Sequence, residues 1–197
     1  SDLNKTDRNI KIQEMESFID CYGAWIEGLR AERSSPNFID RYHNAADKHI
    51  AQCEESYRRM KYGLFLLKTD DVAWNAFQLT NRAMFMQRIH GTFQKKERYP
   101  GDEIWQQEMS TLDYHTYSDE KCRWRPFQLA FLLMSIRSII DPTCEERDLV
   151  DLIWFPTGGG KTEAYLGLTA FTIFHRRLTN PTNGGTTVMM RYTLRLL

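Results

Sequence analysis

Apolar residues recur every three or four positions through the first half of the chain, the spacing that places them on one face of a helix. One such run extends from about residue 9 to residue 30, and a second from Ile39 to Leu64. A third opens at residues 69–71 and continues to Ile89. Each run predicts an amphipathic helix, and the succession is typical of an antiparallel bundle. The same apolar stripes are also compatible with a docking surface for a partner protein.

The helical pattern fades between residues 91 and 121. Charged residues there mix with the pair Pro100-Gly101, which is a turn signal and indicates a connector or a loop-rich insertion. We therefore predict a domain boundary in this region. It separates a helical N-terminal domain at residues 1–115 from a second domain at residues 116–197.

The second domain combines helical patterns with short apolar runs. Residues 125–140 and about 161–178 are expected to be helices, whereas residues 149–155 and 186–191 read as buried strands. A strand, a loop, a helix and a second strand make one βαβ unit, whose strands are parallel. The predicted fold class is thus an α-helical N-terminal domain followed by the beginning of an α/β P-loop domain with a parallel sheet.

The sequence PTGGGKT lies between the first predicted strand and the helix after it. Gly158, Gly159 and Gly160 let the backbone approach a phosphate closely and aim successive N–H groups at it, next to the positive end of the helix. Lys161 can reach the β- and γ-phosphates, and the Thr162 hydroxyl can bind Mg²⁺. We therefore predict ATP and Mg²⁺ as cofactors, Thr162 as the metal ligand, and Lys161 with Thr162 as the catalytic residues.

The strict phosphate-loop pattern begins with glycine, and Phe155 stands at that position. The match is therefore to a looser form of the pattern. The alternative is a glycine-rich turn between strand and helix, followed by an accidental Lys-Thr pair. Phosphate binding alone also does not separate kinases, transporters, GTPases and motor ATPases.

Two motifs narrow these choices by resemblance. PTGGGKT resembles motif I of the superfamily 2 helicases and translocases, and RPFQ (residues 125–128) resembles their Q motif. The resemblance implies that Gln128 recognises adenine, that Arg125 and Phe127 shape the adenine pocket, and that Thr157 belongs to the cofactor site. An amide can read adenine because it donates and accepts together. The alternative for Gln128 is a surface position on a helix.

The stretch RYTLRLL, at residues 191–197, resembles motif Ia of the same superfamily, which touches the nucleic-acid backbone. Thr193 and Arg195 are the candidate phosphate contacts. The proline and the arginine of that motif are replaced here by Tyr192 and Leu194. Plain packing and a solvated helix face remain the alternative.

The resemblance extends to one family. Residues 154–178 and 184–197, and less specifically the stretch MESFIDCYGAWIE, are similar to the DrmA helicase family of bacterial DISARM anti-phage systems. This implies a RecA-like second domain, an ATP-driven motor acting on DNA, and a DrmB-like partner subunit. Such motors also need an acidic box and a second RecA-like domain after motif I. We therefore expect an N-terminal fragment that is inactive alone, and the start at Ser1 indicates processing or trimming.

Composition changes this picture little. Hydrophobic residues make up 42% of the chain, enough for a core, and 26 Lys+Arg balance 26 Asp+Glu, so no global charge favours nucleic acid. The four cysteines form no C-x-x-C pair, and no apolar run approaches the length of a membrane span, about 18 residues. We expect a cytoplasmic protein with no membrane partner.

Two alternative functions remain. One is a P-loop kinase or signalling NTPase, and the other is a scaffold whose helical half docks a partner.

Overall fold

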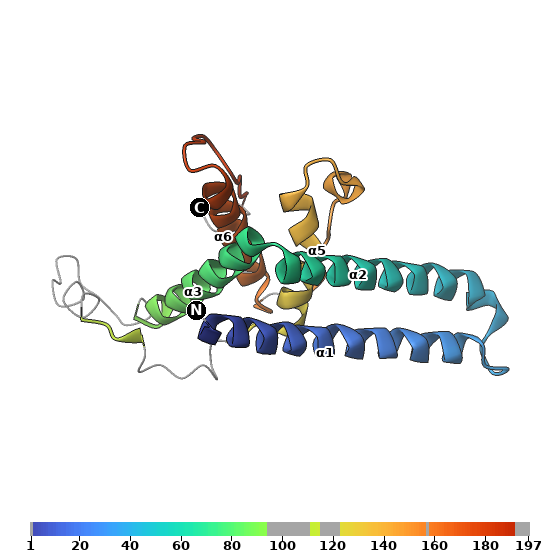
Figure 1. The fold of residues 1–197 in the computed structure, drawn as a ribbon. Helices are drawn as coiled ribbons and strands as arrows, with labels where there is room; N and C mark the ends of the chain where they lie inside the picture. The colour runs from blue at the N-terminus through green and yellow to red at the C-terminus, as the bar shows by residue number, and fades with distance from the viewer. Residues whose placement is uncertain (1, 94–110, 115–122, 157, 192–197) are drawn as a thin grey trace. The chain divides into compact units, whose positions relative to one another are not determined.

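The structure, a computed structural model, describes residues 2–93, 111–114, 123–156 and 158–191. Helices dominate these ranges, and they agree closely with the helices predicted from apolar spacing (Figure 1). The elements are α1 (Asp2–Arg33), η1 (Asp40–Tyr42), α2 (His43–Thr69), α3 (Asp71–Phe93), α5 (Pro126–Ile140), η4 (Glu145–Asp148) and α6 (Lys161–Thr179).

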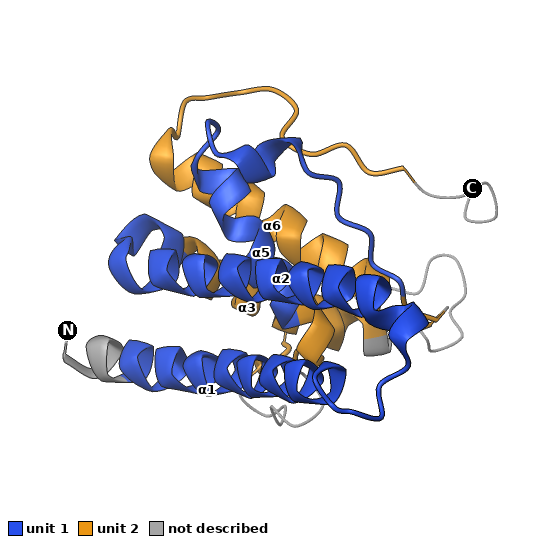
Figure 2. Cartoon of the chain, turned by 90° about the vertical axis from the view of Figure 1, so that its right-hand side faces the viewer, with its two compact units in different colours: residues 1–75, 129–154 blue, residues 76–128, 155–197 orange. Residues whose placement is uncertain are grey.

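The chain divides into two compact units (Figure 2). Unit 1 comprises Ser1–Asn75 and Leu129–Trp154, and unit 2 comprises Ala76–Gln128 and Phe155–Leu197. Helices α3 and α5 therefore each contribute to both units. The domain boundary predicted between residues 115 and 116 lies outside the described residues and stays a prediction.

In unit 1, α1 and α2 lie side by side and run in opposite directions (Figures 1 and 2). The buried positions of α1 follow the spacing that the sequence predicts for one helix face. Its buried apolar side chains are Ile12, Met15, Ile19 and Ile26. Trp25 stays 51% exposed, so Ile26 is the buried residue of this pair.

The turn from α2 to α3 depends on Asp70. Its backbone N–H ends α2 by donating to the Leu66 carbonyl (2.8 Å), and its carboxylate accepts from the backbone N–H groups of Val72 (2.8 Å) and Ala73 (3.1 Å). One residue therefore satisfies the end of one helix and caps the start of the next, and the third helix begins within residues 69–71, as predicted.

No strand occurs in the described residues, so the prediction of a parallel sheet and of the beginning of an α/β RecA-like domain is wrong. Leu149 has extended backbone angles (φ −80°, ψ 140°), but a strand also needs a neighbour with which to exchange hydrogen bonds. The side chains of Val150, Leu152 and Trp154 are 96%, 79% and 87% exposed. These three apolar side chains of the first predicted strand are therefore not part of a core.

Charged side chains, and not a hydrogen-bonded ladder, bind the two runs that were predicted as strands. Asp151 accepts two hydrogen bonds of 2.7 Å from the guanidinium of Arg59, which is 7% exposed. In unit 2, Arg176 in the last turn of α6 donates to the Thr186 carbonyl (3.1 Å) and the Thr187 hydroxyl (2.9 Å). The apolar composition of the two runs therefore did not indicate the contacts that they make, which are with arginine side chains.

A second ion-pair network in unit 1 centres on Glu146. Its side chain is 2% exposed, and Oε1 accepts from Arg137 (2.8 Å) and Arg58 (3.0 Å). Burial raises the pKa of the Glu146 carboxyl, but hydrogen bonds from Arg137, Cys144 and Arg58 outweigh burial, so the pKa lies below its ordinary value of 4.5. The network joins α2, α5 and η4.

Within the described part of the chain, no helix combines the length and the apolar character that crossing a membrane requires. Cys21, Cys53 and Cys144 are free thiols there, whereas Cys122 lies outside the described residues.

Substituting Gly63 tests the close approach of α2 and α5. A Cβ at Gly63 would collide with the backbone carbonyl of Leu133, which cannot turn away as a side chain can. We expect Gly63→Ala to lower the free energy of unfolding by about 1–3 kcal/mol. The control is Gly28→Ala on α1, where an added Cβ meets nothing within 4 Å. That variant should gain about 0.5–1 kcal/mol from helix propensity. Urea unfolding measures both, and equal stability of the two variants would contradict this packing.

Substituting Glu146 tests the buried carboxylate. A group whose folded pKa is depressed contributes stability above its unfolded pKa and loses it as pH falls through the folded pKa. Wild type should therefore lose more stability than Glu146→Gln when the pH is lowered from about 7 to about 3. The remaining carboxyls contribute to both curves alike, so the difference isolates Glu146. Parallel curves in pH-dependent thermal melts would show that Glu146 is not held ionised.

Candidate functional site

The glycine loop has the backbone that a phosphate cradle needs. Gly158 (φ 79°) and Gly160 (φ 91°) are left-handed, and the N–H of Gly159 closes a turn onto the Pro156 carbonyl (3.0 Å). Gly160 is the N-cap of α6, so the helix begins at Lys161. The first N–H groups of a helix have no partner within the helix, which makes them available to an anion.

Lys161 folds back over this loop. Its ammonium donates to the carbonyls of Phe155 (2.5 Å) and Pro156 (3.0 Å). These are neutral acceptors, and a phosphate oxygen would form a stronger, charge-assisted hydrogen bond with the same ammonium. Thr162 follows in the first turn of α6 and is exposed, so its hydroxyl is accessible to a metal ion.

Gln128 joins the RPFQ segment to the glycine loop. It is 5% exposed, its Oε1 accepts from the backbone N–H of Arg125 (2.8 Å), and its Nε2 donates to the Gly160 carbonyl (2.8 Å). Arg125 adds a hydrogen bond from its guanidinium to the Gly159 carbonyl (2.6 Å). The structure thus brings two motifs together that lie about thirty residues apart, and Gln128 is not a surface residue.

The contacts leave part of the amide available. A carboxamide has two donor hydrogens and two acceptor lone pairs, and Gln128 uses one of each in these bonds. One donor hydrogen and one acceptor lone pair of the amide therefore remain outside these two bonds.

Phe155, which replaces the first glycine of the strict pattern, stacks on Phe127 of the RPFQ segment. The ring centroids are 4.0 Å apart and the rings are inclined by 19°. The departure from the pattern therefore supplies an apolar contact between the loop and the RPFQ segment, and Phe155 is 45% exposed at this place. The sequence indicated Phe155 only as a mismatch.

Trp124 is a second residue of this cluster that reasoning from the motifs missed. Its indole ring packs on Gly167 of α6, and its N–H donates to Asn81 of α3. In the sequence it stands directly before RPFQ and among the basic residues of the stretch KCRWR.

Three predicted site residues lie outside the described residues: Thr157, Thr193 and Arg195. Their predicted roles, in cofactor binding and in nucleic-acid contact, stay predictions.

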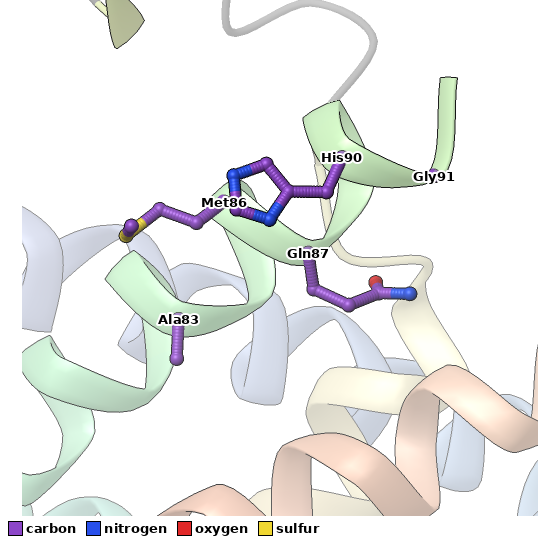
Figure 3. Close-up of a pocket in the computed structure, with 5 residues that line it drawn as sticks. All are labelled: Ala83, Met86, Gln87, His90 and Gly91. Atoms are coloured by element: carbon purple, nitrogen blue, oxygen red, sulfur yellow. The ribbon is translucent and has the colours of Figure 1, made fainter. Parts of the chain in front are cut away.

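A hollow of about 440 Å³ occurs elsewhere in unit 2, on one face of α3 (Figure 3). It is lined by Ala83, Met86, Gln87, His90 and Gly91. His90 hydrogen-bonds the Tyr114 hydroxyl (2.7 Å). The hollow shares no residue with the glycine loop or with the RPFQ segment.

No protein-family model matches the sequence. The chain is, however, 33% identical over 199 residues to the DISARM protein DrmA of Bacillus paralicheniformis (strain ATCC 9945a / NCIMB 11709 / CD-2), an alignment that covers 97% of this chain. The chain resembles DrmA. The family resemblance inferred from the motifs is therefore confirmed, and it includes the helical half, where the motifs were weakest. The chain spans 16% of the length of DrmA.

Alanine substitutions in the loop test its geometry. Both Gly158 and Gly160 have left-handed backbone, where a non-glycine residue costs about 1–2 kcal/mol. A Cβ at Gly158 meets nothing within 4 Å, whereas one at Gly160 would stand 2.7 Å from Nε2 of Gln128. We therefore expect Gly160→Ala to destabilise the chain more than Gly158→Ala, which is the matched control, in urea unfolding. Equal destabilisation would mean that the Gln128 amide does not occupy this place.

Proposed function

We propose that the chain binds ATP with Mg²⁺ as part of a cytoplasmic DNA helicase or translocase in a DISARM-like defence against phage. The observation that carries this proposal is the meeting of RPFQ and the glycine loop through Gln128 and Gly160. A nucleotide site must present an adenine-reading group and a phosphate cradle to one molecule. Two motifs about thirty residues apart that came together by chance would not be expected to share a side-chain hydrogen bond of 2.8 Å.

Each residue has a distinct role in this proposal. The backbone N–H groups of Gly158, Gly160 and the first turn of α6 bind phosphate oxygens, and the Gly159 N–H joins them by exchanging the Pro156 carbonyl for phosphate. Gln128 reads the adenine with its remaining donor and acceptor. Lys161 exchanges the carbonyls of Phe155 and Pro156 for the β- and γ-phosphates, a favourable exchange because the new bonds join opposite charges. Thr162 contributes a hydroxyl to Mg²⁺.

The action on DNA, and a DrmB-like partner, rest on the similarity to DrmA. Thr193 and Arg195 are the proposed contacts to the DNA backbone. The 26 basic and 26 acidic residues balance, so DNA binding by this chain would be local and would depend on such individual contacts.

Lys161→Ala tests nucleotide binding. We expect the variant to bind MgATP about 10- to 100-fold more weakly than wild type, because a charged donor to the phosphates is lost. Lys48→Ala, an exposed lysine on α2, is the matched control and should bind as wild type does. Isothermal titration calorimetry measures all three proteins. Absence of MgATP binding by wild type would favour the scaffold function.

Motor activity is tested by a second measurement, of ATP hydrolysis with and without DNA. It uses a protein that contains this chain and is as long as DrmA. ATP hydrolysis that DNA stimulates, and that Lys161→Ala abolishes, is expected of a helicase or translocase. Hydrolysis that is indifferent to single- and double-stranded DNA would instead favour a kinase or a signalling NTPase.

A further inference from the structure

The indole of Trp124 is held at both ends. At one end, the N–H donates to Oδ1 of Asn81 (2.6 Å), and the Asn81 amide donates in turn to the Phe77 carbonyl (2.8 Å) of the same helix, α3. At the other end, the six-membered ring lies so close to Gly167 that a Cβ there would stand 2.6 Å from Cη2. Two helices therefore determine the position of one side chain in the segment that connects to RPFQ.

Gly167 lies on the helix that carries the phosphate cradle. Helix α6 begins at Lys161, and its buried face comprises Ala164, Gly167 and Phe171. Trp124 packs on this face, two turns from the start of the helix. Because the rise of a helix is regular, about 1.5 Å per residue, the contact relates the position of Trp124 to that of the glycine loop.

The phosphate cradle and the RPFQ segment are held in place by different contacts. The phosphate cradle is covalently continuous with α6 and keeps its place without the indole. Arg125 and Gln128, in contrast, reach the loop through hydrogen bonds to Gly159 and Gly160. Those hydrogen bonds are partly exposed, and such bonds contribute only about 0.5–1.5 kcal/mol each. The indole adds to them a packed contact with α6 and a hydrogen bond to α3.

We infer that Trp124 is a positioning residue of the nucleotide site: it holds Gln128 at the distance from the phosphate cradle at which one adenine nucleotide reaches both. This inference rests on the proposed ATP site. It assigns to Trp124, Asn81 and Gly167 a part in affinity for the nucleoside end of the ligand, although none of these residues belongs to a phosphate-binding motif. Inorganic tripolyphosphate, which has the phosphates but no base, separates this role from phosphate binding.

The main variant is Gly167→Ala, which keeps Trp124 and should not weaken the helix, since alanine is the better helix former. Its Cβ displaces the indole. We expect its affinity for MgATP to fall about tenfold while its affinity for tripolyphosphate changes by less than about threefold. Gly28→Ala, where the added Cβ meets nothing within 4 Å, is the matched control and should bind both ligands as wild type does.

Trp124→Phe and Trp124→Ala complete a double-mutant cycle. If Gly167 acts through the indole, Gly167→Ala should have no further effect on MgATP affinity in the Trp124→Ala background. Should Trp124→Ala fail to fold, as judged by circular dichroism, the cycle is made with Trp124→Phe, which keeps a ring but loses the bond to Asn81.

Three results would overturn the inference. MgATP affinity unchanged in Gly167→Ala and in the Trp124 variants would remove any role for the indole and leave the proposed ATP site intact. Equal losses for MgATP and tripolyphosphate would show a general structural effect instead of positioning of the base. The wild-type protein could also bind tripolyphosphate as tightly as MgATP, or bind neither ligand. Either result would overturn the proposed adenine site and this inference with it.

Discussion

The side-chain amide of Gln128 is the contact on which the candidate site depends. A buried amide must satisfy its polar atoms within the protein, because leaving one unpaired costs about 1–3 kcal/mol. Gln128 does so by binding the Arg125 backbone with its oxygen and the Gly160 carbonyl with its nitrogen. Two observations explain why residue 160 is glycine. Its backbone is left-handed, and a Cβ there would stand 2.7 Å from Nε2 of Gln128.

Unit 1 shows the same principle with charges. Glu146 is almost fully buried and receives hydrogen bonds from arginines on α2 and α5, and Arg59 binds Asp151 through two nitrogen atoms. Breaking a buried ion pair leaves an uncompensated charge, so such pairs hold segments in defined positions even where their net contribution to stability is small. The backbone at residue 151, only four residues before Phe155, is held in this way. Both units therefore use buried polar groups to place segments that are distant in sequence.

The helices could be predicted from the sequence because their information is local. Apolar residues at a period near 3.6 define a face, and Asp70 carries its own capping chemistry. The absence of strands could not be predicted in this way, because the run from Leu149 to Phe155 has the composition of a strand in any context. Whether such a run becomes a strand depends on a neighbour, and the described residues supply an arginine instead.

The sequence by itself determined the helices, the glycine loop with its lysine, and the resemblance to DrmA, since all three are written in short stretches of residue types and spacings. The tertiary structure alone decided through which atoms RPFQ meets this loop, that Phe155 stacks on Phe127, and that Trp124 lies between Asn81 and Gly167. The physical reason is that packing and buried hydrogen bonds join residues tens of positions apart. No local pattern records which partner a buried polar atom or a ring will find.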